Sequence, residues 1–282
     1  MGNDSNMTIL KEPVNTHLET IMVPSLIDDY QIPMKVYIKE DFLKKTDEKR
    51  PILFYLFGGA FHFEDQLWDK EEFLNMGFII IHVRYRLCPK IKYPVPLEDA
   101  YSCLNYIQKL SHPLIKDHWD TRIALYGSSA GGNIAACSCL LMRERGLAMN
   151  VLCQILEYPA LFYLENVKSH ILYKDWYIHG EDTVRYIDNM YMRSEKDYEN
   201  QYLCPMKAKD LTILPDAYFL LAERDYFCSE GEVYCEMLKK SGNNAVCMIY
   251  PQEHGFMGKS SIGKKALGEL LKYLQKKLEE TK

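Results

Sequence analysis

The chain has 282 residues, 48% of them hydrophobic and 26% charged, which is the composition of a globular protein and excludes a disordered or fibrous one. The 34 Lys and Arg residues against 39 Asp and Glu residues give a net charge of −5. No basic run stands out, which argues against nucleic acid or an anionic membrane as a partner. No apolar stretch approaches the ~18 residues needed to span a bilayer, and residues 1–13 lack the apolar core of a signal peptide.

Short apolar runs alternate with amphipathic ones, which is typical of a mainly parallel sheet covered by helices. Residues 17–23 and 32–39 are amphipathic and predict an antiparallel edge of the sheet. Further strands are predicted at 52–57, 78–83, 123–126, 151–156, 217–222 and 246–250. Helices are predicted at 96–110, 130–145, 229 to about 242, and 264–278.

Two other features bear on the organisation of the chain. Residues 160–215 contain no strand-like run, and since a structureless loop of that length is uncommon, we predict a helical insertion over the sheet. The nine cysteines are an odd number without a Cys-x-x-Cys pair. They predict reduced thiols in a cytoplasmic protein, with neither disulfides nor a structural metal.

The strongest local signal is Gly127-Ser128-Ser129-Ala130-Gly131, between a short apolar strand and an Ala-rich helix. G-x-S-x-G in this context indicates a nucleophile elbow, a sharp turn that projects the Ser129 hydroxyl from the end of the sheet. The helix N-terminus places the Ala130 N–H beside the nucleophile and favours developing negative charge there. The alternative, which we favour less, is a glycine-rich turn without chemistry.

A nucleophilic serine needs a base, and the base needs an orienting carboxylate. In this arrangement the chain order is serine, acid, histidine. Of the histidines that follow Ser129, His170 and His179 fall in the insertion. His254 follows the last predicted strand, where a loop at the carboxyl edge of the sheet would lie. We therefore predict His254 as the base, the alternative being a solvated loop histidine.

The acid should follow the strand predicted at 217–222. Glu223 and Asp225 both do, whereas Asp216 precedes that strand. Asp225 is the preferred acid, with Glu223 as the competitor and Asp216 as a poorer candidate. The positions of these three residues in the sequence do not by themselves distinguish strongly between them.

Backbone donors for an oxyanion are predicted directly after the strand at 52–57, in Gly58-Gly59-Ala60. Two glycines, an alanine and no proline leave N–H groups free to face a ligand. We assign the N–H groups of Gly59 and Ala60, together with that of Ala130, as the oxyanion donors. The alternative is a tight turn that requires glycine for a positive φ.

Several segments over about residues 50–260 carry a resemblance to one protein family, in that family's order. They are 57–61, 85–89, 93–100, 127–133, 157–159, 223–225 with Gly231, and 254–256. With them the chain resembles the hormone-sensitive-lipase-like branch of the α/β-hydrolase superfamily. The resemblance implies an esterase with an acyl-serine intermediate and without metal or organic cofactor. It also implies Asp225 as the acid, because this position matches the family's acid.

The chain departs from the family pattern at three positions near the predicted site. Phe57 stands where the family usually has His, Ala60 where it has a third glycine, and Ser128 where it has Asp or Thr. The family's His usually supports the oxyanion loop, and we consider that Phe57 instead lines the acyl pocket. Ala60 keeps its N–H, so the oxyanion site survives if the backbone there does not require a positive φ.

The predicted architecture is a single α/β-hydrolase domain over residues 1–282, with a mostly parallel central sheet flanked by helices. A helical cap is expected from about 1–20 and 160–215. Arg86, Glu98 and Asp99 are expected to form a structural ion-pair network. The predicted function is a serine carboxylesterase for small, short-chain esters, acting as a monomer or homodimer. Left open are an amidase, formamidase or carbohydrate deacetylase with the same triad, and a catalytically weak small-molecule-binding member of the fold.

Overall fold

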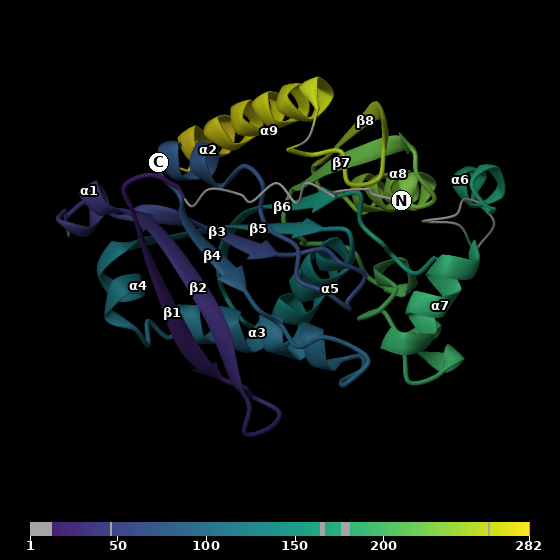
Figure 1. Cartoon of the computed structure of the whole chain (residues 1–282), viewed down its shortest axis with the longest axis horizontal. Helices are drawn as coiled ribbons and strands as arrows, with labels where there is room; N and C mark the ends of the chain where they lie inside the picture. Colours follow the sequence, from purple (N-terminus) through teal and green to yellow (C-terminus); the bar gives the residue numbers. More distant parts are fainter. Residues whose placement is uncertain (1–12, 46, 164–166, 176–180, 259, 282) are drawn as a thin grey trace, which may run out of the picture.

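The computed structural model describes residues 13–45, 47–163, 167–175, 181–258 and 260–281, and its centre is an eight-stranded sheet of order β1-β2-β4-β3-β5-β6-β7-β8 (Figure 1). The pairs β1–β2 and β2–β4 are antiparallel, and the other neighbouring strands pair in parallel. The predicted mostly parallel sheet with an antiparallel edge is therefore confirmed. The strands are β1 (Thr16–Pro24), β2 (Gln31–Lys39), β3 (Arg50–Leu56), β4 (Ile79–Val83), β5 (Trp119–Ser128), β6 (Asn150–Glu157), β7 (Ala217–Arg224) and β8 (Ala245–Glu253).

Helices cover both faces of the sheet, with α9 on one face and α3 and α5 on the other (Figure 1). The α-helices are α1 (Glu40–Leu43), α2 (Lys70–Asn75), α3 (Val95–Gln108), α4 (Pro113–His118), α5 (Ala130–Glu144), α6 (Lys168–Leu172), α7 (Glu181–Tyr191), α8 (Cys228–Lys240) and α9 (Ser261–Glu280). Two 3-10 helices, η1 (Glu195–Glu199) and η2 (Pro205–Lys207), follow α7.

The apolar pattern of each element explains its place in the fold. Every residue of β4 is buried, as expected for a strand with helices on both faces. In α9, buried Leu267, Leu270, Leu274 and Leu278 recur at helical spacing and face the core. The side chain of Ser260 caps this helix, accepting a hydrogen bond from the Gly263 N–H at 2.9 Å.

The residues assigned to a cap divide into three parts. Residues 160–215 carry α6, α7, η1 and η2, with no strand among their described residues. Residues 16–20 belong to β1, where Thr20 pairs with Lys35 of β2. Their assignment to the cap was therefore wrong, because their alternating pattern is that of an edge strand. Residues 1–12 of the assigned cap lie outside the described residues.

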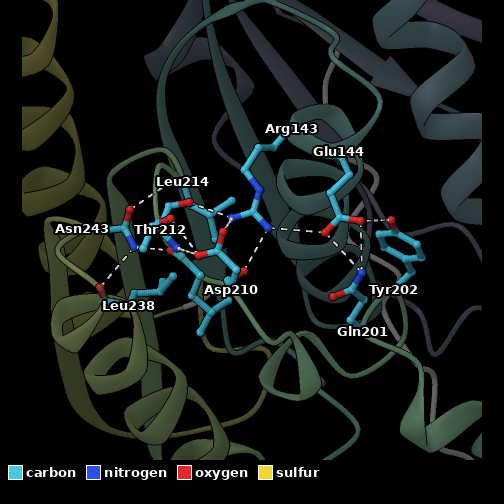
Figure 2. Close-up of polar contacts among 10 residues, drawn as sticks. Arg143, Glu144, Gln201, Tyr202, Asp210, Thr212, Leu214, Leu238 and Asn243 are labelled. Carbon is cyan, nitrogen blue, oxygen red and sulfur yellow. Dashed lines mark hydrogen bonds and ion pairs between the residues drawn. The ribbon is translucent and has the colours of Figure 1, made fainter.

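A polar network holds the end of the insertion against the body of the domain (Figure 2). The Arg143 guanidinium at the end of α5 donates to the carbonyl oxygens of Thr212 at 2.7 Å and Asp210 at 2.9 Å. The Asn243 side chain accepts from the Leu214 N–H at 2.9 Å. Because this backbone directly precedes β7, the network fixes the position at which β7 begins.

The predicted ion-pair network is only partly correct. Arg86 pairs with the buried carboxylate of Asp99, with an Nη2–Oδ1 distance of 2.7 Å, and also contacts Asp28. Glu98 instead pairs with Arg145, whose Nη1 lies 2.7 Å from its Oε2. Consecutive helical residues point in different directions, which separates Glu98 from Asp99.

Candidate active site

Ser129 occupies the sharp turn between β5 and α5, with φ 53° and ψ −115°. A positive φ in a residue other than glycine costs about 1–3 kcal/mol and persists only where surrounding contacts impose it. Here the Ser129 N–H donates to the Glu157 carbonyl at 2.8 Å, and the Ser129 carbonyl accepts from the Gly132 N–H at 2.9 Å. This is the strained strand-to-helix geometry that the G-x-S-x-G pattern predicts.

The glycines on either side of Ser129 allow strand and helix to approach closely. A Cβ on Gly127 would lie 2.2 Å from the Gly131 carbonyl oxygen. A Cβ on Gly131 would lie 2.0 Å from the Leu56 carbonyl oxygen of β3. Both obstacles are backbone atoms of the central sheet and the α5 N-terminus, which cannot move without disturbing the core.

We expect Gly131→Ala to destabilise the protein by about 3 kcal/mol or more, because overpacking against backbone forces strand and helix apart. Gly268→Ala in α9 is the matched control, since a Cβ there meets nothing within 4 Å. That substitution should stabilise the protein by about 0.5–1 kcal/mol. Urea unfolding of both variants checks the difference, and equal stability would refute the close approach at the elbow.

Three distant side chains converge at the carboxyl edge of the sheet. His254 Nε2 lies 2.9 Å from Ser129 Oγ, and His254 Nδ1 lies 2.6 Å from Asp225 Oδ2. Asp225 is fully buried, and its other oxygen accepts from the Phe227 N–H at 3.1 Å. The carboxylate favours the tautomer with the proton on Nδ1, in which Nε2 carries the lone pair that accepts the serine proton. The structure thus brings together the three side chains named from sequence.

The other candidates for base and acid lie elsewhere or outside the described residues. His170 is buried against Glu230, with an Nε2–Oε1 distance of 2.8 Å. Glu223 is exposed near the end of β7. Asp216, at the opposite end of β7, pairs with Lys277 at 2.6 Å. His179 lies outside the described residues.

The predicted oxyanion donors line the same cavity as Ser129. Gly59, Ala60 and Ala130 all face it. The chain turns directly after Gly59. The Gly59 carbonyl closes this turn by accepting hydrogen bonds from the N–H groups of His62 at 2.8 Å and Phe63 at 3.0 Å. From sequence, we expected the oxyanion site to survive if the backbone at Ala60 does not require a positive φ. In the structure, φ at Ala60 is positive, at 53°. Alanine occupies this left-handed region at a cost of about 1–2 kcal/mol, and its N–H is retained.

Phe57 does not line this cavity, so its expected place in an acyl pocket was wrong. Its buried ring stacks on Tyr85 with 4.0 Å between the ring centroids. The Tyr85 hydroxyl also donates to the Phe57 carbonyl at 2.7 Å. Phe57 and Tyr85 therefore pack together at the start of the predicted oxyanion loop.

The cavity beside Ser129 has a volume of about 300 Å³ and mainly apolar walls. Phe61 and Phe63 come from the oxyanion loop, and Val184 and Ile187 come from α7. Sequence reasoning missed the α7 residues, because their helix carries no motif that links it to the elbow.

A buried carboxyl group, Glu157, lies directly beneath the elbow. It accepts hydrogen bonds from the hydroxyls of Tyr126 and Ser128, the latter at 3.1 Å. Burial raises the pKa of Glu157 above its usual value. Sequence reasoning gave this residue no role, although it precedes Tyr158-Pro159 in one of the matched segments.

A second carboxyl group near the elbow, Asp69, has a pKa raised to about 7 by burial and by the negative charges of Glu72 and Glu157. A carboxyl whose pKa is higher in the folded than in the unfolded state binds more protons when folded. Its contribution to stability is therefore present at low pH and is lost as the pH rises toward about 7.

We expect Asp69→Asn to raise the free energy of unfolding at pH 8 and to have a smaller effect at pH 5. The neutral amide avoids the cost of a partly buried charge. Urea unfolding at both pH values measures the difference, with the exposed Asp41→Asn as the control. A gain from Asp69→Asn that is larger at pH 5 than at pH 8 would contradict the assignment.

Comparisons with known proteins show which family the chain is similar to. The sequence pattern of a family described as alpha/beta hydrolase fold matches residues 53–258. The arylesterase of Saccharolobus solfataricus is 29% identical over 278 residues, covering 93% of this chain and 85% of that protein. Carboxylesterase NlhH of Mycobacterium tuberculosis is 28% identical over 246 residues, covering 80% and 71%.

Solved structures extend the likeness to the fold. A hyperthermophilic esterase from Pyrobaculum calidifontis superposes with a TM-score of 0.79 at 28% identity, covering 90% of this chain and 84% of that one. The carboxylesterase EstE1 from a metagenomic library gives a TM-score of 0.82 at 27% identity, covering 93% and 89%. The chain belongs to the α/β-hydrolase family, and its predicted resemblance to the hormone-sensitive-lipase-like branch is confirmed.

None of the described helices combines enough length with enough apolar character to cross a bilayer.

Proposed function

We propose that this protein is a serine carboxylesterase that hydrolyses small, short-chain acyl esters through an acyl-enzyme intermediate. The observation that carries the proposal is the continuous hydrogen-bonded series from Asp225 through His254 to Ser129 at the wall of an apolar cavity. Membership of the α/β-hydrolase family and the names of the relatives support an enzyme that acts on esters. A cytoplasmic location and a monomeric or homodimeric state stay predictions.

The first half of the reaction forms the acyl-enzyme. His254 Nε2 takes the proton of Ser129 Oγ as this oxygen attacks the ester carbonyl carbon. Asp225 holds the reactive tautomer and stabilises the imidazolium that forms. The N–H groups of Gly59, Ala60 and Ala130 stabilise the negative oxygen.

The first half ends as the tetrahedral intermediate collapses: the bond between the carbonyl carbon and the alcohol oxygen breaks, and His254 protonates the departing alcohol. In the second half, water attacks the acyl-serine while His254 accepts its proton. The bond between the acyl carbon and Ser129 Oγ then breaks, His254 returns the proton to Oγ, and the carboxylic acid leaves. Every proton moves through the Nε2 atom that lies 2.9 Å from Ser129 Oγ.

The cavity favours short acyl chains. Its volume of about 300 Å³ lies at the lower end of the range of about 300–1,000 Å³ for small-molecule pockets. Phe61 and Ile187 supply apolar walls that suit a hydrocarbon group. A long chain would have to extend beyond these apolar walls.

A series of p-nitrophenyl esters from acetate to decanoate tests the proposal. We expect the highest kcat/KM among the short acyl groups and a decline towards decanoate. The p-nitroanilide of butyrate should be hydrolysed more slowly than the matching ester. Faster anilide hydrolysis would favour an amidase, and a lack of hydrolysis of every ester would favour a small-molecule-binding member of the fold.

A further inference from the structure

A second cavity, of about 310 Å³, adjoins the one beside Ser129 under α6 and α7. The two cavities share lining residues, which places them side by side. The shared residues are Ala160, Phe162, Val184, Asp188 and Phe227. We call the second space the polar chamber, because titratable side chains from α6, α7 and α8 line it.

Asp188 is the charged group at the boundary between the two cavities. Asp188 is 7% exposed, and its Oδ2 accepts a hydrogen bond from the Tyr198 hydroxyl at 2.7 Å. A carboxyl group offers about four acceptor positions, so one hydroxyl leaves capacity for a ligand. Burial raises the pKa of Asp188 to about 7, so both its neutral and its ionised forms are accessible near neutral pH.

The remaining charges of the polar chamber pair with one another. Glu230 accepts from His170 at 2.8 Å and from the Leu161 N–H at 2.8 Å, which uses both of its oxygens. At the outer side, Glu181 pairs with Arg185 at 2.7 Å and also faces Lys174. The positive and negative charges that line the polar chamber are therefore nearly balanced. This environment is compatible with a neutral ligand.

We propose that the polar chamber binds the hydroxylated alcohol portion of the ester, and that Asp188 determines this specificity. The substrate class is then a short-chain acyl ester of a polyol, with its acyl group in the apolar cavity. This inference rests on the proposed function. Hydrolysis consumes one water, breaks the bond between the acyl carbon and the alcohol oxygen, and releases the acid and the free polyol.

The choice of a hydroxyl over a cation follows from the groups present. A hydroxyl can donate to ionised Asp188 or accept from its neutral form, whereas an ammonium group requires the ionised form. Glu181 already pairs with Arg185 and Lys174, so its carboxylate is not available to a cation. The aromatic side chains of Phe162 and Phe227 offer apolar faces to the carbon skeleton of a polyol.

The test compares esters with one acyl group and different alcohols: 1-butyrylglycerol, propyl butyrate and butyrylcholine. We expect wild-type kcat/KM for 1-butyrylglycerol to exceed that for propyl butyrate by about tenfold or more. A ratio of this size corresponds to the contribution of a buried hydrogen bond. Asp188→Leu should reduce this ratio towards one, mainly through KM for 1-butyrylglycerol. Asp182→Asn, an exposed carboxylate change on the same helix, should keep the wild-type ratio.

Asp188→Asn provides a second variant that retains an acceptor for the Tyr198 hydroxyl. It should also lower the ratio, but by less than Asp188→Leu, and thermal unfolding confirms that each variant is folded. A wild-type ratio near one, or an unchanged ratio in a folded Asp188 variant, would overturn the inference. A preference for butyrylcholine that Asp188→Asn removes would overturn it in favour of a cation site.

p-Nitrophenyl butyrate separates the two possible failures. Hydrolysis of this ester without preference among the three alcohols would refute the polar subsite and leave the proposed esterase intact. A lack of hydrolysis of all four butyrates would refute the esterase and, with it, the inference that rests on it.

Discussion

Ser129→Ala is expected to lower kcat/KM for p-nitrophenyl butyrate on the order of 10³-fold or more. The substitution removes the only atom that can form the acyl bond in the proposed mechanism, while the oxyanion donors remain. The fold should be preserved, because alanine has the same Cβ as serine at the positive φ of this turn. Thermal unfolding should therefore shift by only a few degrees.

Ser128→Ala is the matched control for this change. Its hydroxyl lies one residue away in the same motif and donates to Glu157 at 3.1 Å. Loss of this one hydrogen bond should cost less than about tenfold in kcat/KM, in line with about 0.5–1.5 kcal/mol for a single hydrogen bond. Equal losses in Ser128→Ala and Ser129→Ala would mean that the effect of Ser129→Ala is structural rather than chemical.

Asp225→Asn is expected to reduce kcat by about 10³–10⁴-fold with little change in KM. The amide is nearly isosteric, but it can donate its N–H to His254 Nδ1 and so favour the tautomer with the proton on Nε2. That tautomer cannot accept the proton of Ser129. The substitution of Asp225 by Asn also removes the negative charge that stabilises the imidazolium.

Glu223→Gln is the control for Asp225→Asn, since Glu223 is the competing acid from the same loop region and is exposed. We expect its kcat to stay within about twofold of wild type, as for most surface changes. Steady-state kinetics on the same ester compare the two variants. A large loss in Glu223→Gln with little loss in Asp225→Asn would assign the acid to Glu223.

Much of the scaffold could be predicted from sequence because its strands are short, continuous apolar runs separated by turn signals. β4 and β7 follow continuous apolar runs, and α9 follows its leucine stripe. Short helices such as α2 and α4, with six residues each, were missed because they are too brief to show a helical period. Residues 17–20 were predicted both as the start of an edge strand and as part of the cap; the strand is confirmed and the cap is wrong.

The residues of the site differ in how far they could be predicted from sequence. Ser129 and His254 follow from a motif and from chain order, which are local properties. The choice of Asp225 over Glu223 needed the family resemblance, because both follow the strand and only three-dimensional structure shows which one points inward. Residues such as Ile187 and Asp188 could not be predicted, since their proximity to Ser129 depends on how α7 packs over the sheet.

Covalent labelling with a fluorophosphonate probe tests the central claim most directly, because it reports whether the hydroxyl of Ser129 is activated in the folded protein. We expect one adduct, located by peptide mass spectrometry on Ser129, slowed by excess p-nitrophenyl butyrate and by His254→Gln, and absent in Ser129→Ala. Inactivation that leaves Ser129 unlabelled, or an adduct on another residue that tracks the loss of activity, would contradict the account.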